Sequence, residues 1–216
     1  MCSHFEAIAR SDMMRQYFAV DNPIEPYKAD VWPNYPAPFI RKHPLVDVGD
    51  EAVPAREALV GRFGLIPHWA KDDKIARHTY NARTETVAEK PSFRDAWRRV
   101  QHAIIPIQAF YEPNWRTGKA RATRIVQANG EPMGIAGLWS QWREPTTGQM
   151  IYSFTMLTVN ADQHPFMRQF HKPEDEKRMI VILPRDRFDE WLSGSISNRN
   201  QIIENSSTTP QLIIEI

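Results

Sequence analysis

The chain has 216 residues and a mass of 25.1 kDa, a length typical of one domain. Hydrophobic residues make up 42% of it and seven residues are Trp, so it carries enough apolar material for one core and does not have the composition of a disordered chain. A net charge of +1 neither requires nor excludes nucleic acid as a partner, so any DNA site must be a local patch.

Cysteine, leader and metal signals are sparse. Cys2 is the only cysteine, so no internal disulfide can form, and this fits a reducing cytoplasm. No basic stretch followed by an apolar run marks a signal peptide, and no apolar stretch approaches the about 20 residues that a membrane helix needs. Neither CxxC nor HExxH occurs. We expect a cytoplasmic protein with no cofactor, no metal and no membrane association.

Proline is concentrated between Pro23 and Pro67, most densely in NPIEPYKADVWPNYPAPF. This stretch predicts a long irregular loop, and such loops in compact domains are usually functional. Beyond it, short apolar runs rich in β-branched and aromatic residues predict strands, several of them separated by turn sequences such as ANGEP. The predicted strands are Leu59–Ile66, Ala103–Tyr111, Thr123–Val126, Met133–Trp142, Tyr152–Val159, Met179–Leu183 and Leu212–Ile216.

Three short helices are predicted around these strands. SFRDAWRR starts at Ser92, a residue suited to capping; RDRFDEWLSG follows Pro184 and ends in Gly194; ISNRNQIIENS is the third. No repeat, low-complexity tract or linker divides the chain. The sequence therefore predicts one α+β domain over residues 2–216, with a mostly antiparallel β-sheet core, peripheral short helices and a loop-rich face.

Polar residues gather in a few blocks: Cys2, FGLIPHW (Phe63–Trp69), YNARTET (Tyr80–Thr86), AFYEPNW (Ala109–Trp115) and QFHKPEDEKRM (Gln169–Met179). Taken singly, each block has a plain structural explanation. Trp69 is a core candidate, Glu112 the solvated end of a strand, and His171 a loop histidine. Arg83 and Glu85 form at most a weak surface pair worth ~0–1 kcal/mol.

In this order the blocks resemble the SRAP family (SOS-response-associated peptidase), from Cys2 to about Leu183. The resemblance implies a curved, barrel-like antiparallel core with a loop-rich DNA-binding face. It also implies a protein that binds single-stranded DNA in the DNA damage response, on the nucleoid after damage. We expect a monomer, because the motifs are complete within one chain. Such proteins link covalently to abasic sites through a cysteine that removal of Met1, autocatalytic or by an aminopeptidase, leaves at the N-terminus.

The chemistry follows from the cysteine. An abasic site is partly an open-chain aldehyde, which the α-amine of Cys2 attacks to form a Schiff base. The thiol then closes on the imine carbon and gives a five-membered thiazolidine, whereas a lysine would stop at the hydrolysable imine. A free α-amine has a pKa of about 7.7–8.0 and a thiol one near 8.5. The Schiff base acidifies the neighbouring sugar carbon, so β-lyase cleavage is an expected side reaction.

The resemblance assigns roles to other residues by motif. Asn81 orients the sugar or the cysteine backbone, and Arg83 holds a phosphate bidentately. Glu112 takes and returns protons during imine formation, and His171 acts on the sugar ring oxygen to help open the ring. Arg178 is a second candidate for a phosphate contact.

Further DNA contacts are expected from Trp69, by stacking on bases, from His4, and from Asn34 in the proline-rich stretch. Three departures from the family pattern stand out. His4 replaces the usual Arg, so a phosphate contact there becomes pH dependent. The E-W motif is lengthened to EPNW after Glu112. KPEDEK separates His171 from Arg178, so His164 is an alternative to His171 as the ring-opening histidine.

Two other functions compete with this hypothesis. In the first, Cys2 is the nucleophile of an N-terminal-nucleophile hydrolase, a self-processing cysteine peptidase or an amidotransferase relative. In the second, the protein is a non-catalytic binder of single-stranded DNA and Cys2 is incidental; it would show salt-sensitive binding and no adduct.

Overall fold

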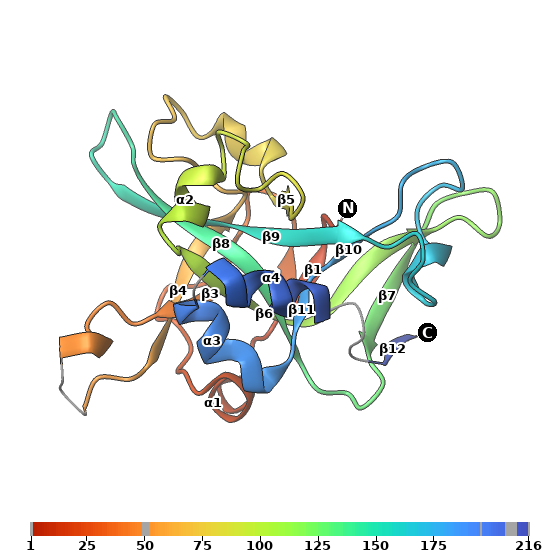
Figure 1. Cartoon of the computed structure of the whole chain (residues 1–216), viewed down its shortest axis with the longest axis horizontal. Coiled ribbons are helices and arrows are strands. Elements are labelled where there is room, and N and C mark those ends of the chain that lie inside the picture. The colour runs from red at the N-terminus through yellow and green to blue at the C-terminus, as the bar shows by residue number, and fades with distance from the viewer. Residues whose placement is uncertain (1, 49–51, 195, 206–210, 216) are drawn as a thin grey trace.

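The computed structural model describes residues 2–48, 52–194, 196–205 and 211–215, and it shows the predicted α+β fold (Figure 1). Within these residues the strands form one mixed sheet of 12 strands, and the helices are short. The strands are β1 (Phe5–Ala7), β2 (Asp30–Val31), β3 (Pro36–Lys42), β4 (Arg56–Phe63), β5 (Asn81–Arg83), β6 (His102–Asn114), β7 (Arg121–Gln127), β8 (Met133–Arg143), β9 (Met150–Asn160), β10 (Arg178–Ile180), β11 (Ile182–Leu183) and β12 (Leu212–Ile214).

The helices are α1 (Ser11–Phe18), α2 (Arg94–Arg98), α3 (Phe188–Ser193) and α4 (Ile196–Asn205), with 3₁₀ turns η1 (Val46–Val48), η2 (Lys74–His78), η3 (Met167–Gln169) and η4 (Arg185–Arg187). None of the helices in the described part of the chain has the length and apolar character needed to cross a membrane.

Five strands close the sheet into a barrel. Their order is β8, β9, β4, β3 and β6, and β6 pairs back to β8 from His102↔Leu138 to Ile107↔Met133. Most pairs are antiparallel, as the sequence predicted; β4 and β5 both run parallel to β9. Closure leaves few free edges, so the barrel gives a rigid frame for the residues at its rim.

Alternate residues of the strands build two cores, as the period of a strand requires. Within β6, Ile105 belongs to the cluster inside the barrel, whereas Ile104 belongs to the cluster outside it. The outer cluster takes Met14 from α1, Trp97 from α2 and Trp191 from α3. In Figure 1, α3 and α4 lie together over this side, and α3 contacts both β6 and α4.

Each predicted strand overlaps an observed strand, and Met179–Leu183 divides into β10 and β11. The predicted helices match α2, η4 with α3, and α4; Ser206 and Ile216, the last residues of two predicted elements, lie outside the described residues. The predicted Ser92 cap is wrong. The helix begins at Arg94, its N-cap residue is Phe93, and no side chain caps it.

The proline-rich stretch is not loop throughout, which corrects a second prediction. Pro36 and Pro38 lie within β3, which pairs with β4 along its whole length but with β6 only at Ile40↔Ile104. Most of the edge of β3 that faces β6 has no paired strand, so a proline there, which lacks an N–H, costs no hydrogen bond of the sheet. Helix α1 was also not predicted; its buried Met14 and Phe18 lie one helical turn apart.

Candidate active site

Cys2 lies just before β1, against the strand that carries Glu112. The thiol of Cys2 is 1% exposed, and its Sγ lies 3.5 Å from the carbonyl oxygen of His4. That carbonyl also accepts a hydrogen bond from the backbone N–H of Tyr111, at 3.0 Å. The pairing of β1 with β6 therefore brings the cysteine to Tyr111 and Glu112.

Glu112 is a buried carboxyl group, not the solvated strand end that it could have been. It is 1% exposed, and burial raises its pKa to about 7. Burial, together with the nearby charge of Glu112, raises the pKa of the Cys2 thiol to about 12. Near neutral pH, Glu112 can therefore both give and take a proton, while the thiol keeps its own.

His171 is brought to Glu112 by the backbone as well as by its ring. The backbone N–H of His171 donates to the carbonyl of Pro113 at 2.9 Å, and the ring Nε2 lies 3.3 Å from Oε2 of Glu112. Its φ of 63° is left-handed, a conformation in which His is enriched among non-glycine residues. A backbone hydrogen bond thus joins His171 to β6 at Pro113, the residue directly after Glu112.

The ring of His171 has a defined tautomer when neutral. Nε2 lies 3.2 Å from the carbonyl oxygen of Arg178, which can only accept, so Nε2 carries the proton and Nδ1 is the acceptor. Burial lowers the pKa of this histidine to about 4. The alternative, His164, instead accepts hydrogen bonds from the N–H groups of Phe166 and Met167 at the start of η3. The structure therefore brings His171 to Glu112 and engages His164 elsewhere.

Asn81 and Arg83 project from the same face of β5, because the residue between them, Ala82, is buried on the other. Asn81 donates through Nδ2 to the carbonyl of Tyr80 at 2.8 Å, and its buried Oδ1 has no hydrogen-bond partner among the described residues. Arg83 has a half-exposed side chain, and its Nη1 lies 2.9 Å from Oε2 of Glu176. The buried amide oxygen of Asn81, which can accept a hydrogen bond, and the half-exposed guanidinium of Arg83 thus lie on the same face of β5.

Arg178 occupies a different environment from Arg83. It is 2% exposed, and Glu85 holds its guanidinium bidentately at 2.7 and 2.9 Å. Nη2 also donates to the carbonyl of Thr158 at 2.7 Å, and Nη1 to Glu176 at 2.9 Å. The pair that the sequence suggested between Arg83 and Glu85 is thus replaced by Arg178–Glu85. Both terminal nitrogens of Arg178 are engaged within the protein, whereas its buried Nε has no hydrogen-bond partner among the described residues.

The remaining predicted DNA contacts are His4, Asn34 and Trp69. The ring of His4 is stacked between Trp32 and Tyr111, with centroids 4.0 Å away on each side, and it pairs with Asp30. Asn34 has a left-handed φ of 72°, and its N–H donates to the carbonyl of Phe63 at 2.7 Å.

Trp69 is 48% exposed and follows the FGLIP turn. Gly64 in that turn has φ of 130°, and a Cβ there would clash with the carbonyl oxygen of Ala76, so only glycine lets η2 pack this closely.

Three neighbours of the site were not predicted. Tyr80 packs against the cluster that contains Cys2, and burial, with the charges of Cys2 and Glu112, raises the pKa of its phenol. Its position directly before NAR was the available signal. Trp32 stacks on His4, and Glu176 contacts both arginines; no pattern in the sequence singled them out.

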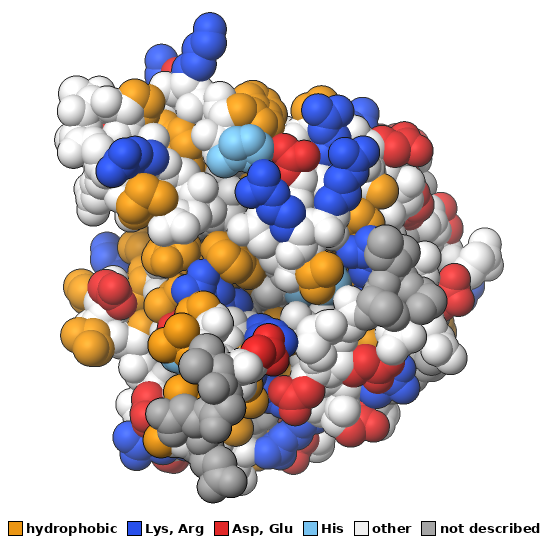
Figure 2. All heavy atoms as spheres, turned by 60° about the vertical axis from the view of Figure 1, so that its left-hand side comes forward, with side chains coloured by type: hydrophobic (Ala, Val, Ile, Leu, Met, Phe, Trp, Pro, Cys, Tyr) orange, Lys and Arg blue, Asp and Glu red, His pale blue; other side chains and the backbone are white. Residues whose placement is uncertain are grey.

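Charges are mixed on the face that Figure 2 shows, where Lys and Arg side chains alternate with Asp and Glu and hydrophobic side chains gather around a hollow. Within the described residues, no group of three or more His, Cys, Asp or Glu side chains is arranged to hold a metal ion.

Comparison with known proteins identifies the class. The family model described as SOS response associated peptidase (SRAP) matches residues 1–213, and the chain belongs to this family. It is 38% identical over 133 residues to the abasic site processing protein YoaM of Bacillus subtilis, covering 61% of this chain and 55% of that protein. It is 27% identical over 176 residues to the abasic site processing protein HMCES of Xenopus tropicalis, covering 69% and 50%. The chain spans about half the length of these curated relatives.

Solved structures agree on the fold. A crystal structure of a protein from Bordetella bronchiseptica is 41% identical, with a TM-score of 0.85, and the match covers 99% of this chain and 98% of that one. A crystal structure of a protein from Bacteroides thetaiotaomicron is 19% identical, with a TM-score of 0.74, over 100% and 92% of the two chains; at this identity it shows the fold alone.

Proposed function

We propose that this protein processes abasic sites in DNA, within the DNA damage response, by forming a covalent bond through Cys2. The observation that carries the proposal is that the buried carboxyl of Glu112 lies near the buried Cys2 thiol and against the ring of His171, in a chain whose curated relatives are named abasic site processing proteins. The activity belongs to one SRAP domain acting as a monomer on single-stranded DNA, on the nucleoid when damage is present.

The reaction begins once Met1, which lies outside the described residues, has been removed. The α-amine of Cys2 adds to the aldehyde carbon of the opened abasic sugar, and loss of one water leaves an imine. Glu112, with its pKa near neutrality, takes the proton of the amine and returns one to the departing hydroxyl. The Cys2 sulfur then bonds to the imine carbon, and its proton passes to the imine nitrogen, which closes the thiazolidine.

His171 serves the step before condensation. Most of an abasic sugar is a closed hemiacetal, which must open before the aldehyde exists. A ring that stays neutral down to a pKa of about 4 can move a proton at the sugar without carrying a charge into the site. Because Nε2 carries the proton and faces Glu112, the ring can pass this proton to the carboxylate while Nδ1 takes one from the sugar hydroxyl.

The DNA strand is held by residues around this centre. The exposed guanidinium of Arg83 binds a phosphate, and Asn81 on the same face positions the sugar. Trp69 offers an exposed ring for a base, and His4 and Asn34 add contacts near Trp32. We assign Arg178 no phosphate contact, because it is buried and its two terminal nitrogens are engaged by Glu85, Glu176 and Thr158.

The acidity of the thiol weighs against a peptidase as the primary function. A cysteine peptidase attacks with a thiolate, and here burial raises the thiol pKa to about 12. An amine that attacks first does not need that thiolate. Peptidase activity in this chain is therefore limited to removal of Met1, and β-lyase cleavage is a side reaction of the imine.

The proposal is tested with single-stranded DNA that carries one abasic site. Wild-type protein should give a band that survives heating in denaturing gels. Cys2→Ser keeps the amine but not the thiol, so its adduct should need borohydride to survive; Cys2→Ala should behave in the same way. A heat-stable adduct of Cys2→Ala without borohydride would overturn the thiazolidine assignment, and no adduct of the wild type would favour the non-catalytic DNA binder.

A further inference from the structure

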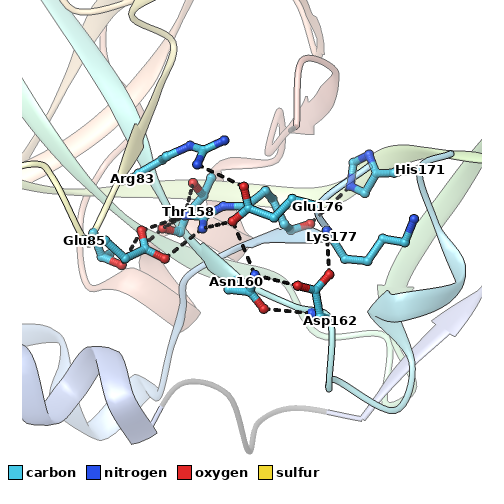
Figure 3. A network of polar contacts seen from close by, with 10 residues as sticks. Arg83, Glu85, Thr158, Asn160, Asp162, His171, Glu176 and Lys177 are labelled. Carbon is cyan, nitrogen blue, oxygen red and sulfur yellow. Dashed lines mark hydrogen bonds and ion pairs between the residues drawn. The ribbon is translucent and has the colours of Figure 1, made fainter. Parts of the chain in front are cut away.

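The six residues KPEDEK between His171 and Arg178 bring a carboxylate onto the predicted phosphate site. Oε2 of Glu176 lies 2.9 Å from Nη1 of Arg83, and Oε1 lies 2.9 Å from Nη1 of Arg178. Glu176 thus bridges an exposed and a buried arginine. Figure 3 shows it among the side chains of Arg83, Thr158 and Asn160, beside the loop that carries His171.

The segment that carries Glu176 is fastened at its end. The backbone N–H of Lys177 donates to Oδ1 of Asp162 at 2.9 Å, and Asn160 donates to Asp162 at 2.8 Å and to Glu176 at 3.3 Å. The side chain of Lys177 also bonds the carbonyl of Lys172, across the same loop. The carboxylate is therefore held on Arg83 by several bonds and is not an isolated surface pair.

A carboxylate and a phosphate use the same donors of a guanidinium. Arg178 cannot respond to DNA, because it is buried and keeps Glu85. Arg83 can, since half of its side chain is exposed. A phosphate that binds Arg83 must therefore compete with Glu176.

We propose that Glu176 is a built-in competitor of DNA phosphate at Arg83, which weakens binding of the strand to this face. The proposal rests on the proposed function, in which Arg83 binds DNA. It makes Glu176 a residue that sets affinity: strands whose phosphate fits Arg83 well displace it, and weakly placed strands do not.

The test measures the dissociation constant of an undamaged fluorescent oligothymidylate by anisotropy. Glu176→Gln should lower it about two- to fivefold, the range that one exposed ion pair commands. Glu174→Gln is the matched control, because it removes the same charge from the same loop and Glu174 forms no ion pair with another described residue. In an Arg83→Gln background, Glu176→Gln should give no gain.

An equal gain from Glu174→Gln, or a gain that persists without Arg83, would overturn the inference. Glu176→Asp controls for a change in the loop structure. It keeps the charge but shortens the reach to Arg83, so it should also lower the dissociation constant of the oligothymidylate. If every variant binds DNA as the wild type does, the inference alone fails. If none binds and no covalent adduct forms, the proposed function fails with it.

Discussion

His171 and Glu112 are joined both through the strand and through their side chains. The N–H of His171 bonds the carbonyl of Pro113, the residue after Glu112, and the imidazole Nε2 lies 3.3 Å from the carboxyl Oε2. Burial moves the two pKa values in opposite directions, to about 4 for the histidine and about 7 for the glutamate. Between these values both groups are neutral, and near pH 7 the glutamate is the one that changes charge.

Removing the proton carrier should slow the reaction. Glu112→Gln keeps the size of the side chain but cannot transfer a proton, so adduct formation should slow by about 10²–10⁴-fold. The wild-type rate should change with an inflection near pH 7, which is where Glu112 titrates, and the variant should lose that inflection. Single-turnover rates across pH measure both effects. A variant that reacts at the wild-type rate would remove Glu112 from the mechanism.

The same substitution should change how stability depends on pH. The pKa of Glu112 is raised from 4.5 in the unfolded chain to about 7 in the folded one, so the folded state binds its proton more tightly. That contribution to the free energy of unfolding is complete below pH 4.5 and is lost as the pH rises through 7. Gln does not titrate, so the stability of Glu112→Gln relative to wild type should rise between about pH 5 and about pH 8, by on the order of a few kcal/mol in the free energy of unfolding. Melting temperatures of both proteins across this pH range measure the change.

A difference in stability between Glu112→Gln and wild type that stays constant with pH would contradict this prediction. It would mean that Glu112 titrates alike in the folded and unfolded chain, and that the carboxyl is not desolvated.

His171 should matter only when the sugar ring must open. His171→Ala should slow adduct formation with an abasic site, again within about 10²–10⁴-fold. It should leave the reaction of Cys2 with a small open-chain aldehyde close to the wild-type rate. His164→Ala is the control and should react with both like the wild type. Equal slowing of both reactions by His171→Ala would assign the histidine to imine formation and not to ring opening.

The two arginines should separate stability from DNA binding. Arg178→Gln leaves the buried carbonyl of Thr158 without its donor and the half-exposed Glu85 without its partner, and should cost about 1–3 kcal/mol in stability. Arg83→Gln removes a half-exposed partner of Glu176, so stability should change by about 1 kcal/mol or less. Thermal melts and binding of single-stranded DNA measure the contrast: only Arg83→Gln should weaken binding without lowering the melting temperature. The reverse pattern would exchange their roles.

The sequence predicted the parts of the fold that local patterns encode. β6 and β8 are long runs of apolar and β-branched residues, so their strand signal is strong. β3 was missed because its prolines mark a loop by pattern, and only its one-sided pairing shows that they are tolerated. β5 is three residues long and has meaning only beside β9.

The site divides in the same way. Motifs pointed to Cys2, Glu112 and His171, but burial of the carboxyl and its contact with the histidine come from strands and loops far apart in sequence. Nothing in a charge run such as KPEDEK shows which carboxylate meets Arg83. That depends on the bonds of Asn160 and Asp162, which only the folded chain brings together.

The most direct test of the central claim is the intact mass of the purified protein before and after incubation with single-stranded DNA that carries one abasic site. The account predicts a protein without Met1 that gains the mass of the DNA minus one water. Cys2→Ala should show no gain when the sample is acidified without borohydride, because its imine hydrolyses. A protein that retains Met1, or that shows no covalent species, would contradict the claim that Cys2 traps the aldehyde.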